Sequence, residues 1–241
     1  MLGANAKPGR ILFAAAAVHA YTASGAVLAF IGIRAVFAGD VRLAFAMMLI
    51  ATLVDSTDGV LARAVRVKET LPSVDGARID DIVDYLTFVV LPMLLLDRFG
   101  FLPSPVALLV VAIVLLSSAY GFGSADAKTA DHFFTGFPSY WNIVALYLYI
   151  FAVPPALTAA ILILLSALVF VRIGYVHPSR TPALRRLTVT LGSAWAVSLA
   201  GLIGWLPSPP RWLAIASLAF PVYYIVLSLV LHARRRPVPA E

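Results

Sequence analysis

The chain has 241 residues, of which 61% are hydrophobic and only 12% are charged, and its mean hydropathy is +0.94. These fractions lie far outside those of soluble globular domains, so the composition excludes an ordinary soluble protein and places the chain in a lipid bilayer. The lack of cysteine excludes disulfides and thiolate metal sites, and the net charge of +6 favours anionic lipid headgroups over nucleic acid as the partner surface.

Long apolar runs follow one another along the whole chain. A helix needs about 20 apolar residues to cross the hydrocarbon core of a bilayer. Cutting the sequence at its polar, proline and glycine positions predicts eight membrane-spanning helices, over residues 11–37, 41–65, 77–97, 104–122, 138–153, 155–175, 185–205 and 211–232. The first run is too long for a secretory leader, so we expect it to remain as a span. The sequence therefore predicts an all-α helical bundle, with residues 1–241 forming one integral-membrane domain.

The positions of the basic residues predict how these helices are oriented. If the N-terminus is cytoplasmic, alternate connections bring all but four of the 18 Lys and Arg residues to the cytoplasmic side. The exceptions are Arg34, Arg42, Arg98 and Arg211. Cytoplasmic loops of membrane proteins carry such an excess of basic residues. We therefore expect a multi-pass protein with both termini in the cytoplasm.

Five aspartates lie where the second predicted span ends and the third begins: Asp55, Asp58, Asp80, Asp81 and Asp84. An Asp at the centre of a bilayer costs about 2.5–3.5 kcal/mol, so a compensating cation is needed. Asp55 and Asp58 are three residues apart and Asp80 and Asp84 are four apart, so each pair projects from one helix face. Antiparallel packing of the two helices would bring four carboxylates together. Oxygen ligands of this kind suit magnesium or manganese, and two ions could share them.

Small residues and an arginine accompany the acids. Gly59, Ala62 and Gly76 would let a ligand or a neighbouring helix approach the backbone closely, and Arg63 is close enough to contact a phosphate. Metal ligands, a phosphate contact and close backbone approach together indicate a site for a nucleotide diphosphate.

Two alternatives stay open for the charged residues. The acids could instead form buried ion pairs with Arg63, Arg66 and Arg78 that hold the helices in register. Asp81 points away from the face of Asp80 and Asp84, and Asp75 lies in the connection, so both are expected to be solvated or to support the site indirectly. The polar residues of the first predicted span either line the cavity or hydrogen-bond a neighbouring helix. They are His19, Tyr21, Thr22 and Ser24.

Residues 55–84 resemble the signature of the CDP-alcohol phosphatidyltransferases, D-x2-D-G-x2-A-R-x8-G-x3-D-x3-D. Its fixed positions are filled by Asp55, Asp58, Gly59, Ala62, Arg63, Gly76, Asp80 and Asp84. The gap between Arg63 and Gly76 is twelve residues instead of about eight. This spacing, the segment V-K-E-T-L-P-S-V-D-G and the later F-F-T-G-F-P-S-Y-W-N-I-V are similar to the bacterial phosphatidylcholine synthase group of that family.

The resemblance implies a reaction and a set of site residues. CDP-diacylglycerol would donate its phosphatidyl group to choline and release CMP. The implied metal ligands, for two divalent ions with manganese preferred and magnesium possible, are Asp55, Asp58, Asp80 and Asp84. Asp84 is also the implied general base and so the catalytic residue. The implied CDP-diacylglycerol contacts are Asp58, Gly59, Ala62, Arg63, Ser73 and Gly76. A homodimer in the bacterial inner membrane, with a cytoplasmic active site, is implied as well.

Choline is a quaternary ammonium ion, which aromatic faces hold with about 0.5–2 kcal/mol each. The candidates near the inner membrane face are Tyr85, Tyr140, Trp141 and Asn142, although anchoring or packing would account equally well for any one of the aromatic residues. A related enzyme using glycerol phosphate, serine or inositol would share the signature. A transporter with an acidic intramembrane site is the non-enzymatic alternative, but it would not need the glycines and arginine at these intervals.

Overall fold

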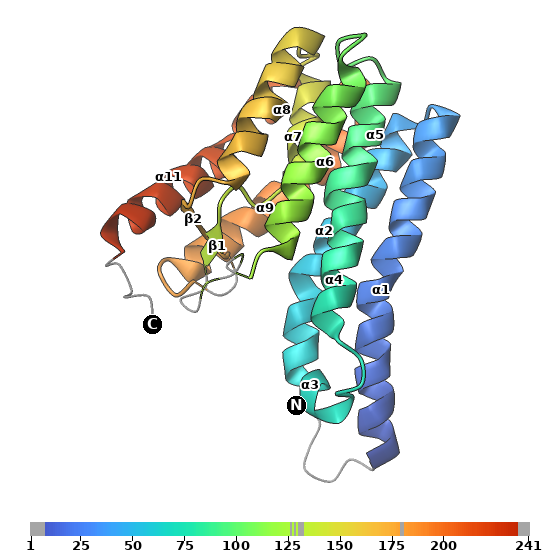
Figure 1. Cartoon of the computed structure of the whole chain (residues 1–241), viewed down its shortest axis with the longest axis vertical. Helices are drawn as coiled ribbons and strands as arrows, with labels where there is room; N and C mark the ends of the chain where they lie inside the picture. Colours follow the sequence, from blue (N-terminus) through green and yellow to red (C-terminus); the bar gives the residue numbers. More distant parts are fainter. Residues whose placement is uncertain (1–7, 126, 128, 130–132, 179–180, 236–241) are drawn as a thin grey trace.

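Helices dominate the structure, a computed structural model that describes residues 8–125, 127, 129, 133–178 and 181–235. The α-helices are α1 (Pro8–Ala38), α2 (Val41–Ala64), α3 (Val67–Thr70), α4 (Gly76–Asp84), α5 (Leu91–Arg98), α6 (Ala107–Gly123), α7 (Trp141–Ile150), α8 (Pro155–Val169), α9 (Arg185–Gly204), α10 (Arg211–Ser217) and α11 (Ala219–Arg234). A π-helical turn, η1 (Tyr85–Val90), joins α4 to α5, and two short strands are β1 (Phe133–Thr135) and β2 (Gly174–Val176). Figure 1 shows α1, α2 and α4 extending together beyond the rest of the bundle.

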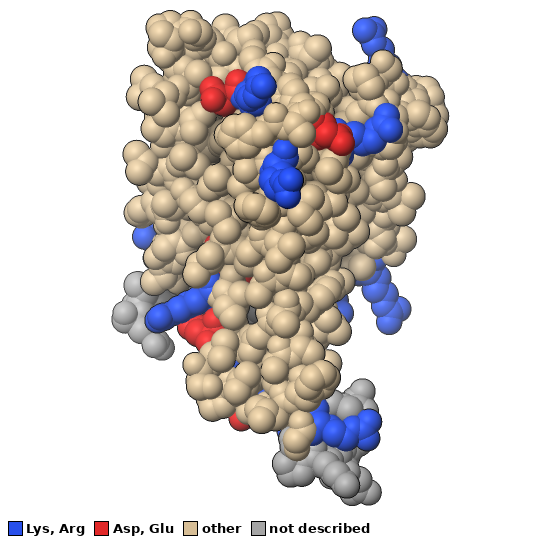
Figure 2. Space-filling view, turned by 90° about the vertical axis from the view of Figure 1, so that its right-hand side faces the viewer, with Lys and Arg blue, Asp and Glu red and all other residues tan. Residues whose placement is uncertain are grey.

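The outer surface of the bundle is apolar. Phe13, Leu108 and Val197 are each more than two-thirds exposed, and a lipid environment removes the cost of exposing such side chains. Figure 2 shows charged side chains gathered toward both ends of one face, with largely uncharged atoms between them. Four helical segments are long and apolar enough to cross a membrane, namely Gly9–Ala38, Val41–Ala64, Arg185–Gly204 and Arg211–Arg234. The chain is thus a helical membrane protein.

Every predicted span contains helix, but the fifth and sixth predicted spans are longer than the helices that the structure shows. The fifth was expected over 138–153, whereas α7 begins at Trp141 and ends at Ile150. The sixth was expected to reach 175, whereas α8 ends at Val169 and the chain then forms β2, which pairs antiparallel with β1. The sequence prediction missed this strand pair because a short apolar run has the same composition in a buried strand as at the end of an apolar helix.

The third predicted span is one helical segment, in which the π-helical turn η1 separates α4 from α5. The N–H of Leu91 donates to the carbonyl of Leu86, five residues earlier, instead of to the residue four earlier. Pro92 follows, and proline has no N–H to donate while its ring collides with the carbonyl four residues before it in a regular α-helix. The wider π-helical turn accommodates this proline, and it begins directly after Asp84.

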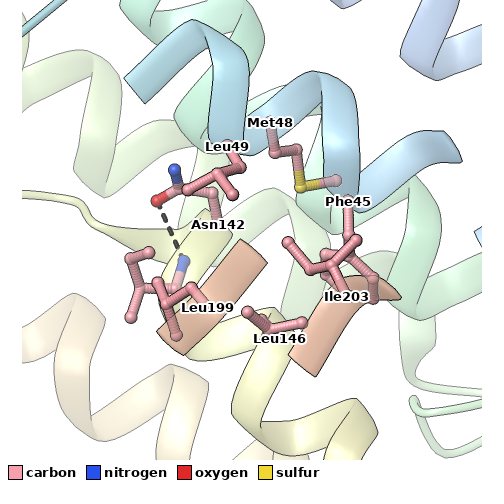
Figure 3. Close-up of a pocket in the computed structure, with 8 residues that line it drawn as sticks. Phe45, Met48, Leu49, Asn142, Leu146, Leu199 and Ile203 are labelled. Atoms are coloured by element: carbon pink, nitrogen blue, oxygen red, sulfur yellow. Dashed lines mark hydrogen bonds between the residues drawn. The ribbon is translucent and has the colours of Figure 1, made fainter. Parts of the chain in front are cut away.

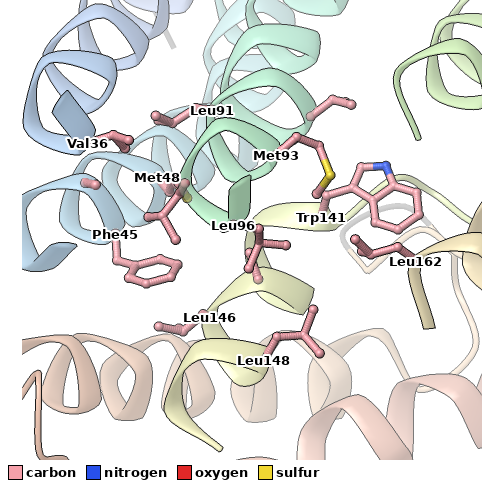
Figure 4. Packing of buried hydrophobic residues seen from close by; sticks show 14 of the residues in the cluster. Val36, Phe45, Met48, Leu91, Met93, Leu96, Trp141, Leu146, Leu148 and Leu162 are labelled. Carbon is pink, nitrogen blue, oxygen red and sulfur yellow. The ribbon is translucent and has the colours of Figure 1, made fainter. Parts of the chain in front are cut away.

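Side chains from most of the helices form one apolar core. Figure 4 shows Phe45, Leu96, Trp141 and Leu162 among the side chains of this core, and each of them is almost completely buried. A cavity of about 10 Å³ remains between α2, α7 and α9, and Figure 3 shows the apolar side chains around it, together with Asn142. That volume is about what one water molecule needs, so this part of the bundle is closely packed.

Two glycines bring α1 into close contact with the segment that carries Asp80 and Asp84. A Cβ atom on Gly25 would overlap Cγ1 of Val83, and one on Gly32 would lie 2.5 Å from Cδ2 of Leu91. Small residues at helix interfaces allow backbones to approach in this way, so α1 lies directly against α4 and α5.

We predict that Gly25→Ala destabilises the protein. Alanine favours helix by about 1 kcal/mol over glycine, but the stiff, β-branched Val83 leaves no space for the methyl group, and overpacking costs about 1–3 kcal/mol. The thermal unfolding midpoint in detergent should fall. Gly9→Ala is the matched control in the same helix, since among the described residues no side chain lies within 4 Å of its Cβ position, and it should leave the midpoint unchanged or raise it. Equal midpoints for the two variants would contradict close packing at Gly25.

Candidate metal and nucleotide site

Three of the predicted metal ligands converge. Asp55 on α2 and Asp80 and Asp84 on α4 each offer a carboxylate oxygen, and these oxygens lie within 4.8 Å of one another. Two oxygens on opposite sides of a magnesium ion are about 4 Å apart, because each is about 2.1 Å from it, so small side-chain movements would let the three share an ion. All three residues are half-buried, and the ligand atoms are hard oxygens. The group therefore fits a divalent ion such as magnesium or manganese.

The antiparallel course of α2 and α4 explains this convergence. The chain leaves α2 at Ala64, turns through α3 and returns in α4, so the acidic faces of the two helices meet (Figure 1). Asp75 begins α4 by accepting hydrogen bonds from the N–H groups of Ala77 and Arg78, at 3.1 and 3.4 Å. Asp75 is thus the N-cap of the helix that carries Asp80 and Asp84. The sequence predicted only that Asp75 would be solvated or would support the site indirectly.

Asp58 differs from the other three acids. It is 7% exposed, and its Oδ2 accepts a hydrogen bond of 2.8 Å from the hydroxyl of Thr22 on α1. Among the described residues, the group of converging carboxylates does not include it. Its place as a metal ligand and as a CDP-diacylglycerol contact therefore stays a prediction.

Two of the three arginines that could have neutralised the acids have acidic partners elsewhere. Arg78 Nε lies 3.2 Å from Oδ2 of Asp75, and Arg66 Nη1 lies 3.9 Å from Oε2 of Glu69. These pairs are mostly exposed to solvent and contribute little to stability. They weaken the alternative in which Arg66 and Arg78 pair with the signature acids.

An open groove of about 320 Å³ lies along the C-terminal end of α2 and begins at Gly59, about one helical turn after Asp55. Its lining residues are Gly59, Ala62, Arg63, Arg66, Val67, Lys68 and Glu69. Three of them are predicted nucleotide contacts, and three cations give the groove a chemistry suited to phosphate. Arg66 and Lys68 were not predicted as nucleotide contacts. Their position between the two halves of the signature was the signal that could have indicated this role. Ser73 is exposed in the connection, and neither it nor Gly76 lines this groove.

Two of the four polar residues of α1 hydrogen-bond a neighbouring helix, and Ser24 donates to the Tyr21 carbonyl within α1 itself. Tyr21 shares a hydrogen bond of 2.8 Å with Thr57, and Thr22 donates to Asp58, which resolves one of the two possibilities left open by the sequence. His19 is buried against Gly76, where an added Cβ would lie 2.8 Å from the imidazole Cε1. Gly76 therefore allows α1 to approach the first turn of α4.

The four choline candidates have different surroundings. Trp141 is fully buried and donates its indole N–H to Ser118 at 2.7 Å, while Asn142 is 3% exposed and donates to Thr52 at 2.8 Å. Tyr85 donates its hydroxyl to the carbonyl of Leu115 and packs edge-on against Phe122. These contacts favour structural roles for Trp141 and Asn142.

Tyr140 lies in the connection just before α7 and belongs to a group of tyrosines. Its ring centroid is 6.3 Å from that of Tyr224, which in turn is 6.4 Å from that of Tyr175. Tyr140 is therefore the choline candidate that lies in a group of tyrosine rings. Tyr175 and Tyr224 were not predicted because only the fold brings them to it.

Several curated bacterial proteins are similar to the chain, although no family model matches it. The phosphatidylcholine synthase of Legionella pneumophila is 43% identical over 169 residues, which cover 70% of this chain and 66% of the relative. The phosphatidylcholine synthase of Legionella bozemanae is 50% identical over 135 residues, which cover 56% of this chain and 62% of the relative. The chain thus spans about two thirds of the length of these two relatives. The phosphatidylcholine synthase of Pseudomonas aeruginosa is 35% identical over 217 residues, covering 90% of this chain and 91% of the relative.

The apolar helical bundle and the signature acids meeting between α2 and α4 define a membrane protein of the CDP-alcohol phosphatidyltransferase type. Sequence identity above 30% over nine-tenths of the Pseudomonas relative shows which family within this class the chain belongs to. The chain belongs to the bacterial phosphatidylcholine synthase family.

We predict that Asp80→Ala weakens manganese binding by at least about tenfold, because it removes one of the three converging ligand oxygens. Manganese affinity of the purified protein, measured by electron paramagnetic resonance, checks this. Asp75→Asn is the control, since asparagine also caps helices well and Asp75 is outside the converging group. An Asp80→Ala protein that binds manganese as tightly as the Asp75→Asn protein would rule out this group as a metal site.

Proposed function

We propose that the protein transfers the phosphatidyl group of CDP-diacylglycerol to choline, producing phosphatidylcholine and CMP. The observation that carries the proposal is the convergence of Asp55, Asp80 and Asp84 beside a basic groove that begins at Gly59. The names of the relatives supply the substrates, and the signature supplies the residue types. Because the matches span only about two thirds of the length of the two Legionella relatives, these substrates are part of the proposal.

Divalent ions complete the proposed site, with manganese preferred over magnesium. Two ions would be held by Asp55 and Asp80 as shared ligands, with Asp58 and Asp84 completing their coordination. When bound, the ions neutralise the negative charge of the diphosphate. The all-oxygen ligand set on α2 and α4 supports this assignment, since hard cations prefer such ligands.

The protein side chains then have distinct tasks. Asp84 acts as general base and takes the proton from the choline hydroxyl. The choline oxygen attacks the phosphorus that carries the diacylglycerol, a new phosphorus–oxygen bond forms, and the bond to the CMP phosphate breaks. Arg63 contacts the diphosphate, while Gly59 and Ala62 let it approach the helix backbone. No covalent intermediate with the protein is needed.

Choline is proposed to bind beside Tyr140. Its quaternary ammonium group cannot donate a hydrogen bond and is attracted to aromatic faces. Tyr140, Tyr175 and Tyr224 provide three such rings next to one another. A cation would gain attraction from each ring face that it contacts.

The membrane arrangement proposed is a homodimer in the bacterial inner membrane with eight spans per chain, both termini in the cytoplasm and the active site open to it. The distribution of basic residues supports this orientation. The beginning of α1 and the α3 turn lie toward the same end of the bundle, which agrees with it (Figure 1). Helices α6, α7 and α8 are apolar but shorter than a perpendicular span requires, so these three are the main test of the count of eight.

CMP release tests the proposal directly. Purified protein given CDP-diacylglycerol and manganese should release CMP only when choline is added, and a chelator should stop the reaction. Asp84→Asn should abolish turnover while leaving nucleotide binding largely intact, because it removes the base. Release that depends on serine, inositol or glycerol phosphate would identify another acceptor. Absence of CMP release with every acceptor would favour the transporter alternative.

We predict that Tyr140→Ala raises the KM for choline by about 2- to 30-fold, the equivalent of one cation–π contact, with little effect on the KM for CDP-diacylglycerol. Tyr140→Phe keeps the aromatic face and should keep a KM close to the original value. Trp141→Phe serves as a control for packing because Trp141 is fully buried. A choline KM that is unchanged in Tyr140→Ala would remove Tyr140 from the choline site.

A further inference from the structure

A residue outside the signature touches one of its acids. Thr22 on α1 is 7% exposed, and its hydroxyl lies 2.8 Å from Oδ2 of Asp58. The carbonyl of Val18 is a second acceptor within reach, at 3.4 Å. A hydroxyl has one proton to donate, and the shorter contact is to a carboxylate, so Asp58 receives it.

The position of Thr22 is fixed by contacts on both sides of it. The neighbouring Tyr21 hydrogen-bonds Thr57, the residue before Asp58, at 2.8 Å. One turn further along α1, Gly25 packs directly against Val83, the residue before Asp84. Helix α1 is thus held against both α2 and α4 at the level of the acids, so the Thr22 backbone cannot move away from Asp58 without disturbing these contacts.

This contact determines how the Asp58 carboxylate is turned. A carboxylate has two oxygens, and a hydrogen bond to Oδ2 restrains rotation about the Cβ–Cγ bond. Oδ1 is then the oxygen available to another ligand. Asp58 lies three residues after Asp55 and therefore on the same face of α2, which is the face that meets Asp80 and Asp84.

We propose that Thr22 is a positioning residue of the acidic site, which holds Oδ2 of Asp58 so that Oδ1 is presented to the ion or diphosphate bound at the converging carboxylates. This inference rests on the proposed function, since it takes Asp58 as a ligand in that site. The competing explanation is a hydrogen bond that only ties α1 to α2. The two differ in what happens to metal affinity when the hydroxyl is removed.

The test uses the full-length protein in detergent and measures manganese affinity by electron paramagnetic resonance, together with the manganese dependence of CMP release. Thr22→Val keeps the shape of the side chain but removes the hydroxyl, and should weaken manganese binding by about 10- to 100-fold. Thr22→Ser restores the hydroxyl and should bring the affinity back close to that of the original protein. Thr158→Val is the matched control, a buried threonine on α8 whose hydroxyl bonds the Val153 carbonyl, and its affinity should not change.

A double-mutant cycle separates positioning from packing. Without the Asp58 side chain there is nothing to orient, so Thr22→Val should cause no further loss of manganese affinity in an Asp58→Ala protein. Unchanged affinity in Thr22→Val, or equal losses with and without Asp58, would overturn the proposal. If Thr22→Val does not fold, Thr22→Ala compared with Thr22→Ser distinguishes the same two explanations. Should the original protein bind manganese but form no phosphatidylcholine, the proposed function fails while the role of Thr22 is still decided.

Discussion

The structure depends on how the chain compensates acids that lie within apolar helices. A carboxylate that leaves water must gain a cation or hydrogen bonds, since otherwise it loses its charge or destabilises the fold. Here α2 and α4 run in opposite directions, so the carboxylates of Asp55, Asp80 and Asp84 come within 4.8 Å of one another, and three like charges at that separation repel. A bound divalent ion turns this repulsion into attraction. The fold and the proposed chemistry therefore have the same requirement.

The connection between the two acidic helices contributes to the site as well as closing it. Its twelve residues are more than the family signature usually has, and they contain the one-turn helix α3, entered through Arg66 with the left-handed φ of 51°. Val67 is buried, which holds α3 against the bundle, while Lys68 and Glu69 line the groove. The longer gap thus adds charged groups where a nucleotide diphosphate would lie.

The sequence predicted those parts of the structure that have a local cause. Hydropathy located the helices. The spacing of three and four residues predicted that four carboxylates would converge, and three of them, Asp55, Asp80 and Asp84, do so. The pairing of β1 with β2 could not be predicted, because residues some forty positions apart had first to be brought together by α7 and α8. The hydrogen bond of Thr22 to a residue 36 positions away also depends on the fold. From the sequence, Thr22 could either line the cavity or bond a neighbouring helix, and the close packing of α1 at Gly25 brings it to Asp58. Trp141 was a plausible choline contact in sequence, yet its indole is turned into the core toward Ser118.

The partners of two arginines weaken the alternative in which the signature acids belong to a structural ion-pair network. In a network, the nearest cations would be directed at the buried acids. Here Arg78 pairs with the acid that caps α4 and Arg66 with Glu69 in the α3 turn, so each is matched by an acid that is not one of the signature residues. Exposed pairs of this kind contribute little to stability, but they direct these side chains toward solvent and the groove. In the proposed function these basic groups would be available to a diphosphate, and the carboxylate oxygens would be available to a divalent ion.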